Sequence, residues 1–147
     1  MIKNTRNLVD ENGGISMNTN NLKTKIQNLY QDILINLDTD KIDDYFAENY
    51  IQETDHDTLN LNEFKDHLQK LKDVVKSLSI EKFNDMLIDE QQRSIFLRYD
   101  VAVEKIDDSK GNIEIYAIFK FNEAGKVISC RELSKAYHED LEGLANI

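Results

Sequence analysis

The sequence contains no proline or tryptophan and only one cysteine among its 147 residues. A single cysteine, Cys130, excludes a disulfide within the chain and suits a reducing compartment, so we expect a cytoplasmic protein. No stretch approaches the roughly 18 consecutive apolar residues of a membrane span, and we expect no membrane contact. The length is that of one domain, large enough to bury its own core.

Basic residues are also scarce. Lys and Arg together number 18 against 28 acidic residues, which gives a net charge of −10. The arginines are Arg6, Arg93, Arg98 and Arg131. Because nucleic-acid backbones are bound by clustered Lys and Arg, we expect no nucleic-acid partner. The acidity itself indicates a well-solvated surface.

Residues 1–17 are polar, include Gly13-Gly14 and show no sustained periodicity. This segment is predicted to be a flexible arm, and Met17 at its end is an alternative start of translation. Residues 18–147 are predicted to form a single domain.

The first half of this domain predicts helices. The first begins at Asn20 or Asn21, either of which can cap it. A second, short helix follows residues 38–40 and leads into a brief strand over 49–52. The first helix carries one apolar stripe at helical spacing, made of Leu22, Ile26, Leu29, Tyr30, Ile33 and Leu37.

A third helix has the clearest start signal in the chain. Asn60 precedes Glu63 by three residues, which is the spacing of a capping box with Asn as the cap. The helix then presents an apolar stripe that is predicted to continue to Leu78. That stripe consists of Leu61, Phe64, Leu68, Leu71, Val74 and Leu78.

The second half predicts antiparallel strands whose apolar and polar residues alternate, with Gly, Asp or Asn in the intervening turns. These strands are expected over 78–89, 93–106, 113–122 and 127–136. The pattern predicts an α+β domain in which a curved antiparallel sheet packs on three N-terminal helices and leaves a cavity. Phe96, Tyr116 and Ile118 on the other face are too apolar for a solvated surface, so we expect a homodimer.

This order of elements resembles the cystatin-like cone of the nuclear transport factor 2-like superfamily, in particular its SnoaL-like branch. Residues 40–52, DKIDDYFAENYIQ, are similar to the "phe-ala-glu/asp … tyr-ile-gln-his" run of that family. Residues 119–128, FKFNEAGKVI, are similar to its "phe-arg-phe … gly-lys-ile" hairpin. The resemblance implies a ligand cavity, but the superfold hosts cyclases, isomerases, hydrolases and non-catalytic modules.

The sequence departs from the family at one position. Glu53 follows Gln52 where the family has His, and His56 comes three residues later. Polyketide cyclases of this type use a His and a carboxylate to move protons beside a carbonyl. That pair does not map onto this sequence residue by residue.

Glu132 is the candidate general base. It is the single charged residue on one face of the last strand, which it shares with Ile128, Cys130, Ser134 and Ala136. If that face looks into the cone, desolvation raises the pKa of Glu132 toward the useful range of a base. The alternative is that Glu132 forms an ion pair with Arg98 or Arg131.

Tyr99 is the candidate hydrogen-bond donor, although a core tyrosine satisfied by the backbone is the commoner case. Tyr50 and Gln52 are expected near the cavity mouth. Cys130 lacks a histidine at motif spacing to activate it as a nucleophile, so a small buried thiol is expected. The predicted ligand-binding set is Tyr50, Gln52, His56, Phe119, Cys130 and Ser134.

Asp55, His56 and Asp57 invite a metal interpretation, but three adjacent loop residues do not converge on one ion without distant ligands. We therefore expect no metal and no cofactor.

Two functions remain open: binding of a small apolar molecule without turnover, or proton transfer beside a carbonyl in an aldol cyclisation or isomerisation. In the second, Glu132 is the base and Tyr99 or Gln52 polarises the oxygen. A protein-interaction module that uses the sheet surface is a third possibility.

Overall fold

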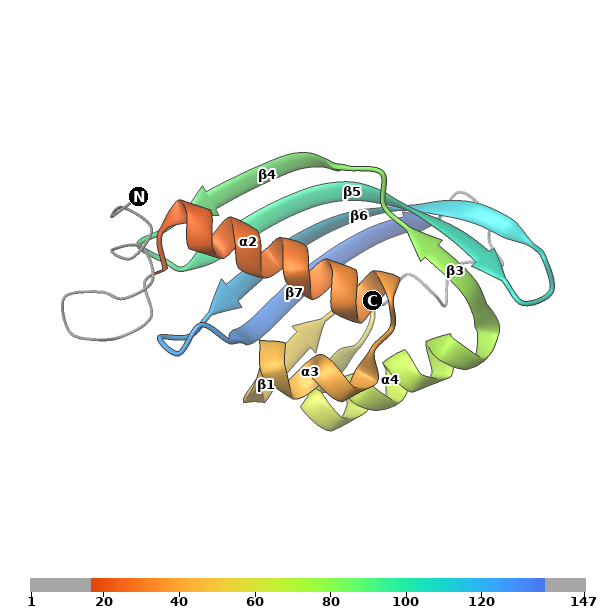
Figure 1. Cartoon of the computed structure of the whole chain (residues 1–147), viewed down its shortest axis with the longest axis horizontal. Coiled ribbons are helices and arrows are strands. Elements are labelled where there is room, and N and C mark those ends of the chain that lie inside the picture. Colours follow the sequence, from red (N-terminus) through yellow and green to blue (C-terminus); the bar gives the residue numbers. More distant parts are fainter. Residues whose placement is uncertain (1–16, 137–147) are drawn as a thin grey trace.

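The computed structural model describes residues 17–136, so all of the predicted arm except Met17 lies outside the described residues. It confirms an α+β architecture in which a curved sheet packs on helices from the first half of the chain (Figure 1). The helical segments are α2 (Thr19–Leu29), the π-helical η1 (Tyr30–Ile35), the 3-10 turn η2 (Thr39–Lys41), α3 (Ile42–Tyr45) and α4 (Leu61–Val74). No helix within residues 17–136 is long and apolar enough to cross a membrane.

The strands form one sheet in the order β2-β1-β7-β6-β5-β3, and β4 pairs with β5 on the same side as β3. Neighbouring strands are antiparallel except β1 and β7, which run parallel, so the sheet is mixed. The strands are β1 (Phe46–Glu53), β2 (Thr58–Asn60), β3 (Val75–Ser79), β4 (Phe83–Asp89), β5 (Ser94–Lys105), β6 (Lys110–Phe121) and β7 (Val127–Ala136).

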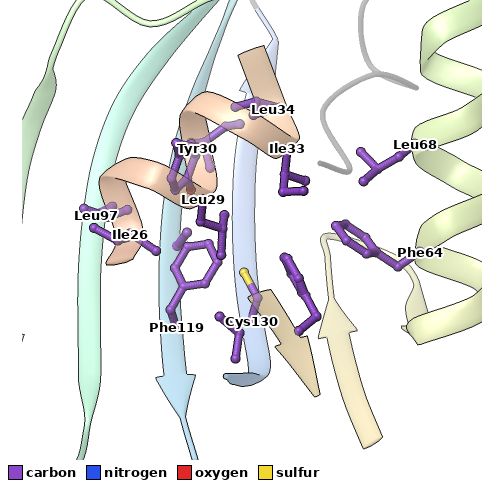
Figure 2. Packing of buried hydrophobic residues seen from close by; sticks show 14 of the residues in the cluster. Ile26, Leu29, Tyr30, Ile33, Leu34, Phe64, Leu68, Leu97, Phe119 and Cys130 are labelled. Atoms are coloured by element: carbon purple, nitrogen blue, oxygen red, sulfur yellow. The ribbon is translucent and has the colours of Figure 1, made fainter. Parts of the chain in front are cut away.

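Strands β4 to β7 form an arch, with α2 along its inner side and α4 near β1 and β2 (Figure 1). Figure 2 shows the core between these layers. Ile26 and Leu29 of α2 lie over Leu97 and Phe119 of the sheet, and α4 contributes Phe64 from the other side. The concave face is therefore the buried face, as the strand alternation predicts.

The cap of the third helix is confirmed. The Glu63 N–H donates to Asn60 Oδ1 at 2.9 Å, and the Asn60 N–H donates to Glu63 Oε1 at 3.0 Å. The predicted extension of this helix to Leu78 is wrong, because α4 ends at Val74 and Leu78 belongs to β3. Val74 and Val75 are consecutive β-branched residues with low helix propensity. The apolar pattern of residues 74–78 is compatible with a helix and with a strand.

The strand predicted over 78–89 is two strands. Pairing of β3 with β5 ends at Ser79, and β4 resumes the pairing at Phe83. The first helix is capped by Asn18, two residues before the nearer of the two predicted caps; the Asn18 side chain accepts from the Asn21 N–H, and the helix begins at Thr19. The brief strand predicted over 49–52 lies within the longer β1, toward its C-terminal end.

Candidate functional site

Strand β7 carries the acidic residue of the site. Cys130 and Glu132 both face the concave side, and Glu132 is only 5% exposed. They lie beside Phe119 and Ala117 of β6, respectively. Val127 is also buried, although strict alternation places it on the opposite face, because the β6–β7 register shifts between Lys120 and Phe121. This irregularity changes which face the residues before Cys130 occupy. From Cys130 onward the side chains lie on the faces that the alternation predicts.

Within residues 17–136, Glu132 forms no ion pair with an arginine. Arg98 pairs with Asp85 at 2.6 Å and with Glu114, and Arg131 pairs with Glu53 at 3.2 Å. The alternative in which Glu132 forms an ion pair with Arg98 or Arg131 is therefore wrong.

The surroundings of Glu132 favour its neutral form. The Cys130 thiol donates to Oε1 at 3.5 Å, and Oε2 is buried without a hydrogen-bond partner within residues 17–136. Burial raises the pKa of Glu132 well above its usual range; the hydrogen bond from Cys130 lowers that pKa, and the charge of Asp55 raises it. Loss of hydration is the largest cause because it disfavours the charged carboxylate.

Two pairs of polar side chains accompany Glu132 in the interior. The hydroxyls of Tyr30 and Tyr99 lie 2.7 Å apart, and the Tyr50 hydroxyl donates to Gln52 Oε1 at 2.7 Å. Burial raises the pKa of each of the three tyrosines, and the charge of Glu132 raises it further. All three phenols therefore keep their protons and act as neutral hydrogen-bonding groups.

The Tyr30–Tyr99 pair has a donor to spare. One hydroxyl donates to the other, so the accepting hydroxyl keeps its own hydrogen for a further acceptor. The ring of Tyr30 is held in place by edge-to-face contacts with Phe83, Tyr99 and Phe119. These contacts fix the direction in which the hydroxyl pair points.

Cys130 is buried and reduced, and burial raises the pKa of its thiol. A thiol that keeps its proton is a poor nucleophile but a competent weak donor. Its role in the structure is the hydrogen bond to Glu132.

The structure brings most of the predicted site residues together. Tyr50 and Gln52, expected at the cavity mouth, are each 1% exposed and lie in the core. His56 lies exposed in the β1–β2 turn, outside this group, while Ser134 is half-buried and binds Asp55. Phe119 contacts Tyr30, as described above. Within residues 17–136 no group of three or more acidic, His or Cys side chains is arranged to hold a metal ion.

Tyr30 is a site residue that the sequence does not single out. It belongs to the predicted apolar stripe of the first helix, but its hydroxyl reaches the hydroxyl of Tyr99. The available signal was a hydroxyl-bearing ring among aliphatic residues, at the point where α2 passes into the π-helical η1. Such π-helical turns occur frequently at functional sites.

Part of the convex face of the sheet is apolar and carries a hollow of about 400 Å³. Tyr116 and Ile118 are each 43% exposed, and Leu133 is 67% exposed. Phe96, Arg131, Glu132 and residues 53–54 complete the lining, so Glu132 borders this hollow as well as lying in the core. The predicted homodimer through this face stays a prediction.

No protein-family model matches the sequence, and no curated protein matches it either. Solved structures do match. BvnE pinacolase from Penicillium brevicompactum aligns with a TM-score of 0.69 at 14% identity, over 79% of this chain and 86% of that one. SalBIII, an epoxide hydrolase/cyclase-like enzyme of pyran ring formation in the polyether salinomycin, aligns with a TM-score of 0.69 at 14% identity, over 81% and 94%.

A candidate SnoaL-like polyketide cyclase from Shewanella denitrificans aligns with a TM-score of 0.68 at 8% identity, over 78% of this chain and 90% of that one. These likenesses show the fold. The protein has the nuclear transport factor 2-like fold of SnoaL-like proteins.

Proposed function

We propose that this protein is an enzyme that moves a proton on a small, largely apolar molecule with a carbonyl group, bound at the concave side of the sheet. The observation that carries the proposal is Glu132, a buried carboxyl group without an ion-pair partner within residues 17–136. Such a group is costly to the fold and is suited to exchanging a proton. The hydroxyl pair of Tyr30 and Tyr99 supplies a donor on the same side of the sheet.

The proposed reaction begins with Glu132 as the base. Its ionised carboxylate takes a hydrogen from the carbon beside the carbonyl, and the electrons of that C–H bond form the C=C bond of an enolate. The negative charge moves to the carbonyl oxygen, where the spare hydroxyl hydrogen of the Tyr30–Tyr99 pair stabilises it. A raised pKa makes Glu132 a stronger base than an exposed glutamate.

The proton returns in one of two ways. If Glu132 gives it back at a different carbon, the result is an isomerisation. If the enolate carbon attacks a second carbonyl of the same molecule, a C–C bond closes a ring, and Glu132 protonates the new alkoxide. Each route consumes no co-reactant and leaves Glu132 ionised at the end. The neighbours named as epoxide hydrolase/cyclase-like and as a SnoaL-like polyketide cyclase support ring-closing chemistry on this fold.

Binding without turnover is the second candidate. The surroundings of the polar pairs are predominantly apolar, with Leu97, Phe119 and Cys130 each at most 4% exposed. A lining of this kind with a single polar anchor is sufficient to hold an apolar ligand. The polar groups beyond that single anchor, Glu132 and the tyrosine pair, favour the enzyme over this candidate.

We also propose that two copies of the chain pair through the convex face, where Tyr116, Ile118 and Leu133 are exposed. Burying these side chains removes apolar surface from water. Leu133→Asp is therefore expected to convert a dimer into a monomer in sedimentation velocity. A wild-type chain that sediments as a monomer at high concentration contradicts this proposal.

The test of the enzyme is hydrogen exchange, because it detects proton abstraction whatever the final product. The protein is incubated in D₂O with 2-tetralone, a cyclohexenone and a 3-ketosteroid, and deuterium beside the carbonyl is measured by mass spectrometry. We expect catalysed incorporation into at least one ketone, reduced about 100-fold or more in Glu132→Gln. Arg131→Ala, on the convex side of the same strand, is the matched control and is expected to keep the rate.

Unchanged exchange in Glu132→Gln contradicts the assigned base. Thermal stabilisation by a ketone without any exchange supports binding without turnover in place of the enzyme.

A further inference from the structure

The turn between β1 and β2 is attached to β7 by one side chain. Asp55 Oδ1 accepts the Ser134 N–H at 2.9 Å, and Asp55 Oδ2 accepts a short hydrogen bond from the Ser134 hydroxyl. The turn itself is closed by the Thr54 N–H, which donates to the Asp57 carbonyl at 2.8 Å. Both ends of the Asp55–Ser134 contact are half-buried.

This contact lies where the strand pairing stops. The parallel pairing of β1 with β7 runs as far as Glu53 and Arg131, so Ser134 lies beyond its end. Asp55 supplies a hydrogen-bond acceptor to β7 at a point where β1 no longer pairs with it. A carboxylate in this position satisfies both the backbone and the hydroxyl donor of Ser134.

The same contact brings a second carboxylate toward the site. Ser134 and Glu132 are two residues apart on one strand face, a separation of about 7 Å along the chain. The groups that face Glu132 from the surrounding elements are Tyr30 of η1, Tyr50 of β1, Tyr99 of β5 and Cys130 of β7, and all four are neutral in their protonated forms. Asp55 is the acidic group whose charge acts on Glu132.

We infer that Asp55 is a positioning residue for the Glu132 site: it fastens the β1–β2 turn to β7 through Ser134 and holds a negative charge beside the buried carboxyl group. The inference rests on the proposed function, in which Glu132 carries the proton.

The experiment measures the ionisation midpoint of Glu132 directly, by carbon NMR of protein labelled at the glutamate side-chain carboxyl carbon. The Glu132 signal is assigned by its loss in Glu132→Gln. The midpoint is then compared in Asp55→Asn, which keeps the size and one acceptor oxygen but removes the charge. Asp57→Asn makes the same chemical change two residues away, at an exposed side chain.

We expect Asp55→Asn to lower the Glu132 midpoint below that of wild type, because a nearby like charge disfavours the carboxylate. Asp57→Asn is expected to leave it at the wild-type value. Ser134→Ala removes the hydroxyl bond but keeps the charge and the backbone bond, so its midpoint should fall less than that of Asp55→Asn. If Asp55→Asn does not fold, Ser134→Ala and Asp55→Glu are compared instead, and both should keep a raised midpoint.

A midpoint in Asp55→Asn equal to that of Asp57→Asn overturns the inference and reduces Asp55 to a cap of the turn. A raised wild-type midpoint in that case leaves the proposed function standing. A wild-type midpoint in the range of an exposed glutamate contradicts the proposed function itself, so the two failures are distinguishable.

Discussion

The two faces of the sheet hold acidic side chains in opposite ways. On the convex face Arg98 lies between Asp85 and Glu114, and all three side chains are in contact with solvent. On the concave face Glu132 is buried, with a thiol as its one hydrogen-bond donor within residues 17–136. Exposed ion pairs contribute little to stability, whereas an unpaired buried carboxyl group costs stability. The comparison identifies Glu132 as the acidic residue that packing alone does not explain.

The tyrosine hydroxyl groups of the two faces also differ in burial, as the acidic side chains do. Tyr116 on the convex face is 43% exposed, while Tyr99 on the concave face is fully buried and bonded to Tyr30. An exposed hydroxyl exchanges its hydrogen bonds with water at little cost. A buried one depends on its protein partner, so the interior pairs are expected to be fixed in direction.

The largest expected difference between the faces is in packing. Phe119→Ala removes a side chain that is 4% exposed and touches Tyr30, so it should lower the free energy of unfolding by about 3–5 kcal/mol. Leu133→Ala removes a side chain that is 67% exposed in the single chain, so in the monomer it should change the free energy of unfolding by about 0.5 kcal/mol or less. Urea denaturation of both variants, at a protein concentration low enough to separate the proposed dimer, measures the two values. Similar losses in both variants at that concentration would contradict the difference in packing between the two faces.

The second difference concerns pH. A raised folded-state pKa means that the folded protein holds the Glu132 proton in a range where the unfolded chain has released it. The stabilising contribution of that proton is complete below the unfolded pKa and is lost as the pH rises through the folded pKa. Glu132→Gln lacks this loss, so its stability relative to wild type should rise with pH, by about 1.4 kcal/mol per pH unit within that window.

Urea midpoints of both proteins from pH 4 to pH 8 check this prediction, and the titration of the other carboxyl groups cancels in the difference. If the difference in the free energy of unfolding between the two proteins does not change over this range, Glu132 is not a buried neutral carboxyl group. If the wild type becomes more stable relative to Glu132→Gln as the pH rises, Glu132 is instead an ion-paired carboxylate.

The smallest expected effect separates the two kinds of tyrosine. Tyr99→Phe leaves the Tyr30 hydroxyl buried without its partner, which should cost about 1–2 kcal/mol. Tyr116→Phe removes an exposed hydroxyl and should change the stability by about 0.5 kcal/mol or less. Thermal denaturation of the two variants is sufficient for the comparison. Equal effects would mean that the interior pair contributes no more than a surface hydroxyl.

The features that could be predicted from the sequence are those with local causes. The capping box of Asn60 and Glu63 needs only its own spacing, and alternation places Tyr99 and Glu132 on the inner faces of their strands. What the sequence could not provide depends on distant partners. The Tyr30–Tyr99 bond joins residues 69 positions apart, and the parallel pairing of β1 with β7 has no local signal. The Asp55–Ser134 contact spans 79 positions and was missed for the same reason.

The measurement that tests the buried carboxyl group most directly is an infrared difference spectrum between the wild-type protein and Glu132→Gln, recorded as the pH is raised from the titration range of an exposed glutamate. We expect the wild type to show, above that range, the carbonyl stretch of a protonated carboxylic acid that the variant lacks, and this band to disappear at the higher pH at which Glu132 becomes the ionised base. A wild type whose band disappears within the titration range of an exposed glutamate would contradict this expectation, because Glu132 would then be an ordinary charged glutamate.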